Sequence, residues 1–282
     1  MTDFHFKQVD YLCKIAESRS ALLSTASIHD TSYASFSGEL VRFAPQQIPQ
    51  KNLFFQSAYA GAKFVLETTD HHIWLLNGGG LRNINNQTCT SIAYVSPFKL
   101  TCGLVKGTGI LVGGKKGLYL FKNKKYESLG DLDPLLKSQI TAMTEDKTGA
   151  IWIATMGKGV LRLKNNKVVH IPDKKGLISN LCTSITLDDY NNIWIGTNKG
   201  LSCIQNIHAE DEQWQIKNID DKNGLNSNDV TTLFANKDVL WVGTMWGLSS
   251  LQIKNCLLPI PVSLAYISSI AVNSSPVSKH LF

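Results

Sequence analysis

Apolar and polar residues alternate along most of this chain, and a short apolar phrase closed by Thr and Gly returns several times. It is clearest at residues 192–201, which read NIWIGTNKGL, and it returns at 239–248 as VLWVGTMWGL. A third copy at 150–160, AIWIATMGKGV, has one extra residue in its turn, and weaker copies lie at 72–81 and 109–118. The copies follow one another at about 40 residues, a period typical of solenoids and propellers.

Each repeat unit reads as four strands. Around Trp194 we predict strands at 182–187, 193–197, 201–205 and 214–219, because β-branched and aromatic residues alternate there between Asn and Gly turns. Four antiparallel strands repeated in this way, with almost no helical pattern, predict an all-β fold, a β-propeller of four-stranded antiparallel blades. The repeated Trp would be a wedge between blades, and its burial contributes about 2 to 3 kcal/mol.

The number of blades is harder to fix at the two ends. Segments 11–17, 21–26 and 40–43 could form a degenerate first unit with a long insertion between the last two. The last unit has predicted strands at 230–235, 240–244 and 248–253 but lacks a good fourth one. Residues 4–9 alternate suitably and could supply it, which would remove exposed strand edges. We therefore favour six blades in a closed ring, with an incomplete seven-bladed ring as the alternative.

Composition narrows the function classes. Lys and Arg number 28 against 22 Asp and Glu, but this excess of 6 is scattered over turn-like segments. A nucleic-acid interface would gather the basic residues on one face with aromatic residues between them, so we expect no nucleic-acid partner. The six cysteines form no CxxC pair and occupy different repeat positions, which predicts small buried side chains and neither a metal site nor a disulfide framework. No cofactor is expected.

The chain also lacks the patterns of targeting and membrane segments. Its N-terminus has no basic segment followed by an apolar stretch, so we expect no secretory signal within it. The longest apolar stretch, 256–272, is interrupted by Pro259, Pro261 and several serines and is too short to span a bilayer. We expect no membrane segment within this chain.

A family resemblance rests on the best repeat. Residues 183–189, 192–197 and 200–201 resemble the two-component regulator propeller repeat, and 175–180 and 223–228 resemble the linker that precedes each blade in that family. Residues 259–273 resemble the beginning of the immunoglobulin-like domain that follows such propellers. The resemblance implies a β-propeller over 1–255 and, over 256–282, a linker with the first strand of a truncated immunoglobulin-like domain.

That family supplies the sensing part of large bacterial receptors. The resemblance implies a periplasmic or otherwise extracytoplasmic location, with a cytoplasmic one as the alternative because the chain shows no signal peptide. Such propellers commonly have seven blades and are followed by a membrane helix and an output module. None of these modules is present here, so the chain is expected to be a fragment or a truncated relative.

No catalytic residues emerge from the sequence. There is no HExxH, GxSxG or P-loop pattern. The stretch 113–117, GGKKG, is glycine- and lysine-rich but lies in a predicted hairpin turn with no following helix, so we interpret it as a turn and not as a phosphate site. Adjacent strand residues point to opposite faces, so His71 and His72 are not expected to share a metal ion.

The geometry of a propeller indicates where a ligand would bind. Turns between second and third strands lie on the same face as the linkers between blades, around the mouth of the central channel, and functional residues are placed on such loops. Trp246 is the unusual residue there, because a large aromatic takes the place that Lys199 has in the preceding repeat. The candidate ligand-binding residues on this rim are Trp246, Met245, Lys199, Met156, Lys158, Asn180, Asn226 and Asn228.

The leading interpretation is a non-enzymatic sensor that binds a small molecule or oligosaccharide, whose binding biases the pairing of two copies; a homodimer is therefore possible. One alternative is a propeller lyase acting on a cyclic peptide antibiotic or a polysaccharide, which should gather His, Glu or Lys at the channel mouth. Another is a protein-interaction platform, which should show an exposed apolar patch on the rim or side.

Overall fold

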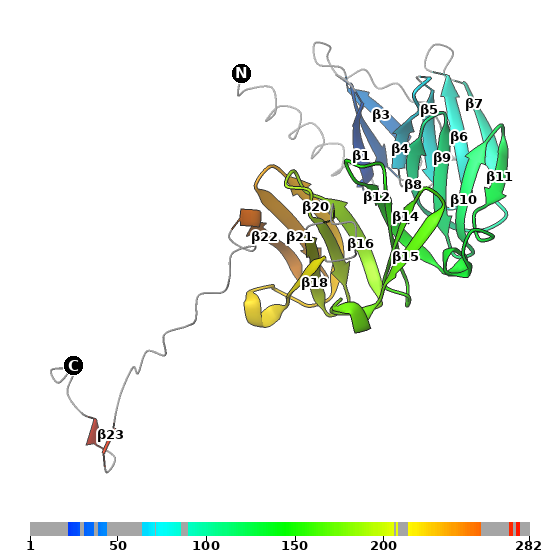
Figure 1. Ribbon diagram of the computed structural model, residues 1–282. Coiled ribbons are helices and arrows are strands. Elements are labelled where there is room, and N and C mark those ends of the chain that lie inside the picture. The colour runs from blue at the N-terminus through cyan, green and yellow to red at the C-terminus, as the bar shows by residue number, and fades with distance from the viewer. Residues whose placement is uncertain are drawn as a thin grey trace.

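The computed structural model describes residues 22–28, 31–36, 39–43, 64–70, 72–85, 90–205, 207, 214–254, 271–272 and 275–276. Only the backbone is described for the strands within 22–43, for 85, 90–91 and for 271–276. The described chain is built of antiparallel sheets that follow one another in chain order (Figure 1).

The first sheet consists of β1 (Leu22–Ile28), β2 (Thr31–Phe36) and β3 (Glu39–Phe43). Four four-stranded sheets follow: β4 (Phe64–Glu67), β5 (Ile73–Asn77), β6 (Gly80–Asn85) and β7 (Thr90–Val95); β8 (Leu100–Lys106), β9 (Gly109–Gly114), β10 (Gly117–Lys122) and β11 (Lys125–Ser128); β12 (Ile140–Glu145), β13 (Ile151–Thr155), β14 (Val160–Lys164) and β15 (Lys167–Ile171); β16 (Cys182–Leu187), β17 (Ile193–Thr197), β18 (Gly200–Gln205) and β19 (Gln215–Ile219). The next sheet has β20 (Val230–Asn236), β21 (Val239–Thr244) and β22 (Gly247–Gln252).

The inner strands of successive sheets lie beside one another, in the order β1, β4, β8, β12, β16 and β20. Each sheet then runs outward through its remaining strands, which is the architecture of propeller blades. The predicted all-β propeller fold is therefore confirmed, and the predicted strands 182–187 and 193–197 match β16 and β17. The count of six blades and the closure of the ring stay predictions; extensive packing of β20 on β1 is not seen among the described strands.

The first unit differs from its prediction. A strand, β2, occupies 31–36, between β1 and β3, where the sequence suggested a long insertion. The prediction failed there because this unit lacks the Trp and Gly phrase that identifies the second strand elsewhere. The predicted strands at 4–9 and 11–17 lie outside the described residues.

Tryptophans of the repeated phrase join neighbouring sheets. Trp152 is fully buried against Ile193 and Ile195 of the next sheet, and Trp194 is likewise buried against Leu240 and Val242. The fourth and fifth sheets thus each present an aromatic wedge to the next sheet, as the sequence predicts, whereas Leu111 takes the place of the Trp in the third sheet.

The last sheet carries the same wedge without a described sheet against it. Trp241 is 40% exposed, whereas Trp152 and Trp194 are 0% exposed. Phe234, directly opposite Trp241 on the neighbouring strand, is 62% exposed, and Leu248 is 61% exposed. We call this surface of Phe234, Trp241 and Leu248 the terminal face.

A threonine at the start of the inner strand ties each central sheet to the next. It lies at a β-bulge, as the register shifts by one residue around Thr101, Thr141, Thr183 and Thr231. The Thr183 hydroxyl lies 3.0 Å from Gly196 O of its own sheet and 2.6 Å from Val230 O of the next. Thr101 and Thr141 make the corresponding pairs of contacts, so the same hydroxyl bridge recurs at three successive junctions.

A buried aspartate holds the turn between first and second strands. Asp146 is 4% exposed and accepts hydrogen bonds from the Trp152 indole (2.8 Å), from the backbone of Ala150 (3.1 Å) and from both the backbone and hydroxyl of Thr148. Burial acts to raise the pKa of Asp146, but these hydrogen bonds outweigh it and hold the pKa below its ordinary value. Asp188 binds the Trp194 indole in the same way (2.8 Å).

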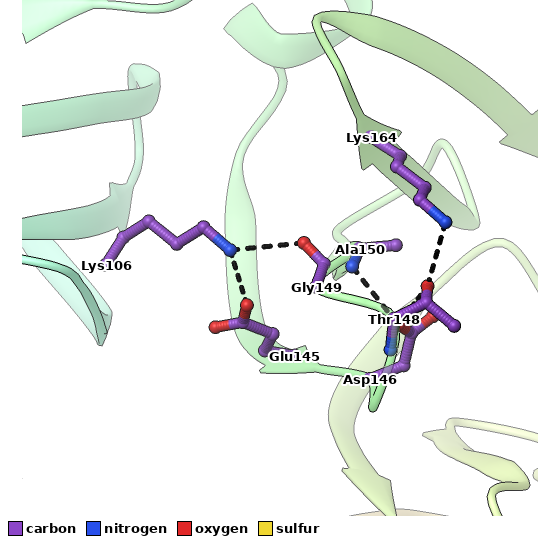
Figure 2. Close-up of polar contacts among 7 residues, drawn as sticks. All are labelled: Lys106, Glu145, Asp146, Thr148, Gly149, Ala150 and Lys164. Carbon is purple, nitrogen blue, oxygen red and sulfur yellow. Dashed lines mark hydrogen bonds and ion pairs between the residues drawn. The ribbon is translucent and has the colours of Figure 1, made fainter.

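Neighbouring sheets are also linked through these turns, at the end of the sheets opposite the predicted rim. Figure 2 shows Lys106 reaching across to Glu145, with which it pairs, and to the Gly149 carbonyl at 3.1 Å. In the same close-up the Lys164 ammonium lies 3.2 Å from the Thr148 hydroxyl, within one sheet. The next two junctions use Lys147, whose ammonium donates to Asp189 O (2.8 Å), and then a hydrogen bond from the Tyr190 hydroxyl to Asp238.

Short 3-10 helices occupy three of the linkers between sheets: η1 (Pro134–Lys137), η2 (Asp173–Lys175) and η3 (Asp221–Asn223). Beyond the sheets, β23 (Ala271–Val272) pairs with β24 (Ser275–Pro276) in antiparallel register. The proposed domain boundary after residue 255 and the immunoglobulin-like identity of 256–282 stay predictions.

Candidate functional site

The turns between second and third strands are fixed beside the start of their own inner strand. In four successive sheets the first turn residue donates its backbone N–H to the carbonyl just before the inner strand. The pairs are Lys115 to Lys99 (3.2 Å), Met156 to Gln139 (2.9 Å), Asn198 to Leu181 (3.4 Å) and Met245 to Asp229 (3.2 Å). These turns therefore lie at one common end of the inner strands, which we call the rim.

The residue just before the closing glycine of each turn has an exposed side chain. Lys116, Lys158 and Lys199 occupy this position in three successive sheets, and Trp246 occupies it in the last one, 82% exposed. Three of these turns share the same hydrogen bond. In each, the hydroxyl of the threonine at the end of the second strand accepts the backbone N–H of Lys158 (3.1 Å), Lys199 (3.0 Å) or Trp246 (3.2 Å). Trp246 is thus presented by the same backbone that presents a lysine elsewhere.

A glycine closes each turn because the backbone there is left-handed, and in all of these turns except the one at Gly247 it is also crowded. At Gly200 φ is +121°, and a Cβ would lie 2.4 Å from Ile219 O. The turn at β13–β14 fits its extra residue by adding Gly157, also left-handed at φ +108°. The sequence prediction of hairpin turns at these positions is confirmed, including the one at Lys115 and Lys116.

The candidate asparagines lie in the linkers and hold them in shape. Asn180 Oδ1 accepts the N–H of Asp173 (2.8 Å), and Asn228 Oδ1 accepts the N–H of Asp221 (2.7 Å), so each anchors the start of a 3-10 helix. Asn226 Nδ2 donates to Leu248 O (3.4 Å). Their hydrogen bonds give these side chains a positioning role at the rim.

All eight candidate residues lie in these turns and linkers. Met156 and Met245 occupy the first positions of their turns and are 42% and 68% exposed. In the Met156 turn, the backbone N–H of Gly157 also donates a hydrogen bond to the Asn180 carbonyl (2.9 Å). Sequence reasoning missed Lys115 and Lys116, which complete the row of lysines. The signal was present, since the weak copy at 109–118 aligns Lys116 with Lys199.

Other chemistry is sparse in the part of the chain that the structure describes. There, groups of three or more His, Cys, Asp or Glu that could hold a metal ion are not found. His72 is exposed and pairs with Asp70 (Nδ1 to Oδ2, 3.1 Å). The described cysteines Cys102, Cys182 and Cys203 are buried, as the sequence predicts. Among described helices, none has the length and apolar character to cross a membrane.

Comparison with protein families identifies the repeats. Residues 134–157 and 176–199 match the family described as two component regulator propeller. Each match runs from the linker, through the inner strand, to the turn that carries Met156 or Lys199. No match is found among curated proteins.

Comparison with solved structures identifies the fold. The extracellular domain assigned to a one-component system of B. thetaiotaomicron superposes with a TM-score of 0.62 at 17% identity, over 82% of this chain and 32% of that one. Virginiamycin B lyase from Staphylococcus aureus gives 0.59 at 11% identity, over 81% and 79% of the two chains. PorZ of the Porphyromonas gingivalis type-IX secretion system gives 0.56 at 15%, over 85% and 40%. The chain thus spans about a third of the first of these structures, and the likeness at these identities establishes the β-propeller fold.

Proposed function

We propose that this chain, whose repeats belong to the two-component regulator propeller family, is a non-enzymatic β-propeller that recognises a ligand for a bacterial signal-transduction receptor. The observation that carries the proposal is the rim, where equivalent turns of successive sheets present unlike side chains on one shared backbone. Trp246 is the most exposed of the large apolar residues described. Large exposed aromatic groups on a rigid support are typical of binding sites.

The eight candidate side chains of the rim are indole, thioether, ammonium and amide groups, which suit ligand binding. The His170 imidazole lies beside them, with Nε2 2.7 Å from the Lys158 carbonyl oxygen. Several of their backbones are pinned by hydrogen bonds, so little conformational freedom would be lost when a ligand binds. A small molecule or oligosaccharide that stacks on Trp246 and contacts Lys199 or Met245 suits this surface.

An extracytoplasmic location forms part of the proposal. It is supported by the family of the repeats and by the likeness to extracellular domains of bacterial signalling systems. Protease added to cells whose outer membrane has been opened, while the cytoplasmic membrane stays intact, should degrade the native protein if it is extracytoplasmic. Full protection, with degradation only after lysis, would contradict this placement.

Ligand-induced stabilisation tests the function. A ligand at about 100 times its Kd stabilises the folded state by about 2.7 kcal/mol, which raises the unfolding temperature by several degrees. We expect members of a panel of neutral and charged oligosaccharides to produce this shift in the wild type and not in Trp246→Ala. Tyr190→Ala is the matched control, since Tyr190 is 43% exposed at the opposite end of the sheets. An equal ligand shift in Trp246→Ala and the wild type would contradict binding at the rim.

The terminal face favours a second function, the pairing of two copies of this chain. Phe234, Trp241 and Leu248 form an apolar surface of the kind that the central sheets bury against a neighbour. Sedimentation of the wild type should then show a dimer, and Leu248→Lys should shift it to monomer without changing its circular dichroism. A monomeric wild type at about 0.1 mM would contradict this, at a concentration where weak pairing of proteins is still detected.

A further inference from the structure

The lysines of the rim stand in register. Lys116, Lys158 and Lys199 hold equivalent turn positions in three successive sheets, and all three side chains are exposed. Lys115 adds a fourth cation at the first position of its turn. The Trp246 turn follows in the next sheet, so a row of positive charges ends at an exposed aromatic ring.

These cations are not neutralised within the described part of the chain. The ion pairs seen there between lysines and carboxylates use other lysines, namely Lys106, Lys137 and Lys254. The four rim lysines therefore keep their charge available to a ligand.

Linker carboxylates near the row are engaged elsewhere. Asp133 and Asp173 accept backbone N–H groups of Leu135 and Lys174, each at 2.8 Å, and Asp131 pairs with Lys137 at 3.5 Å.

Carboxylates become more frequent only in the linker before the last sheet. Asp220 there caps η3 through the N–H of Lys222 (3.0 Å), and Asp221 and Asp229 are exposed. The positive charge is therefore concentrated on the third to fifth sheets, and the aromatic ring lies beyond it.

We infer that the ligand of this rim is an anionic polysaccharide, whose carboxylate or sulfate groups pair with Lys116, Lys158 and Lys199 while one sugar ring stacks on Trp246. This rests on the proposed function and specifies its ligand class. A lysine is a compact point charge that pairs with an anion of any geometry, which suits regularly repeated charges along a flexible chain. Single exposed ion pairs are weak, so recognition would be the sum of several contacts and would weaken steeply with salt.

Dextran sulfate and uncharged dextran of the same length provide a matched pair of probes. We expect calorimetry at low ionic strength to detect dextran sulfate binding, and dextran to bind at least about tenfold more weakly. The combined variant Lys116→Ala, Lys158→Ala, Lys199→Ala should lose about tenfold in affinity for dextran sulfate, which is the sum expected from three exposed pairs. Trp246→Ala should weaken both probes.

The control removes the same charge from the opposite end of the sheets. The variant Lys122→Ala, Lys125→Ala, Lys167→Ala alters exposed lysines beside turns between third and fourth strands, and should change affinity less than about twofold. Equal losses in both triple variants would show attraction by net charge alone and overturn the inference. Equal affinities for both probes would also overturn it.

The outcome separates this inference from the function on which it rests. One outcome would support the binding function but refute the anionic ligand. In that outcome, neutral oligosaccharides bind the wild type and not Trp246→Ala, and the triple lysine variant of the rim binds dextran sulfate as well as the wild type does. Loss of Trp246 dependence for every probe would instead count against the function itself.

Discussion

Replacing Asp146 with Ala should destabilise the protein strongly, because its carboxylate serves donors that have no access to water. Ala150 and Trp152 are both 0% exposed, so their N–H groups would lose their acceptor inside the protein. Each buried unsatisfied donor costs about 1 to 3 kcal/mol, so the two donors together predict a loss of about 2 to 6 kcal/mol. The donors on half-buried Thr148 can turn to solvent and add little.

Urea unfolding followed by circular dichroism measures this loss. The control is Asp189→Ala, an exposed aspartate in the corresponding turn of the next sheet, which should change the free energy of unfolding by no more than about 0.5 kcal/mol. If Asp146→Ala unfolded at the same urea concentration as Asp189→Ala, with the same slope, the reasoning from buried donors would be refuted.

The same carboxylate predicts a pH dependence. Its pKa is lowered in the folded protein, so its contribution is fully present above the unfolded pKa of about 3.9 and is lost as pH falls through the folded value. The difference in unfolding free energy between the wild type and Asp146→Asn should be constant from about pH 7 to 5 and shrink below about pH 4. A difference that grew on acidification would contradict this sign.

Three further measurements probe the junctions between sheets. Thr183→Val should cost about 1 kcal/mol in urea unfolding, and Thr231→Val less, because Thr183 bridges to the next sheet whereas Thr231 bonds Gly243 O on an exposed edge. Trp194→Ala should cost about 3 to 5 kcal/mol and the half-exposed Trp241→Ala clearly less, so equal losses would contradict the role of the buried wedge. Burial raises the pKa of the Cys182 thiol to about 12, so a thiol reagent at pH 8 should label it only after unfolding; rapid labelling of the native protein would contradict its burial.

The fold could be predicted because every four-stranded sheet and the last sheet carry a copy of the repeated phrase, although Leu111 takes the place of the Trp in one of them. The Trp phrase marks the second strand, the following Gly marks the turn, and alternation marks the strands on either side. Where the phrase is missing, at β2, the strand was missed. The inner-strand bridges were also missed, although Thr141 and Thr183 each precede the repeated Trp by the same interval, because their meaning depends on a bulge that the apolar pattern does not show.

The position of the candidate rim could be predicted from the turns, but the roles of its individual residues could not. Lys199 and Trp246 were found because they differ at one repeat position. Asn180 and Asn228 were predicted to line the same rim, but their side chains accept hydrogen bonds from backbone N–H groups seven residues earlier in the chain. These hydrogen bonds depend on how the linker folds back on itself. The sequence pattern does not show that residues seven positions apart in the linker come into contact.

The terminal face has a practical consequence for anyone who handles this chain. Phe234, Trp241 and Leu248 are side chains of the kind that the central sheets bury, but here they are exposed. Such a surface promotes self-association, because contact with another apolar sheet removes it from water and lowers the free energy. If the complementary surface lies elsewhere on the molecule, head-to-tail contact does not close, and the product is a growing fibre instead of a discrete oligomer. Turbidity on concentration would be an early sign of it, and a charged residue in place of Phe234 or Leu248 is the change that should keep the protein in solution.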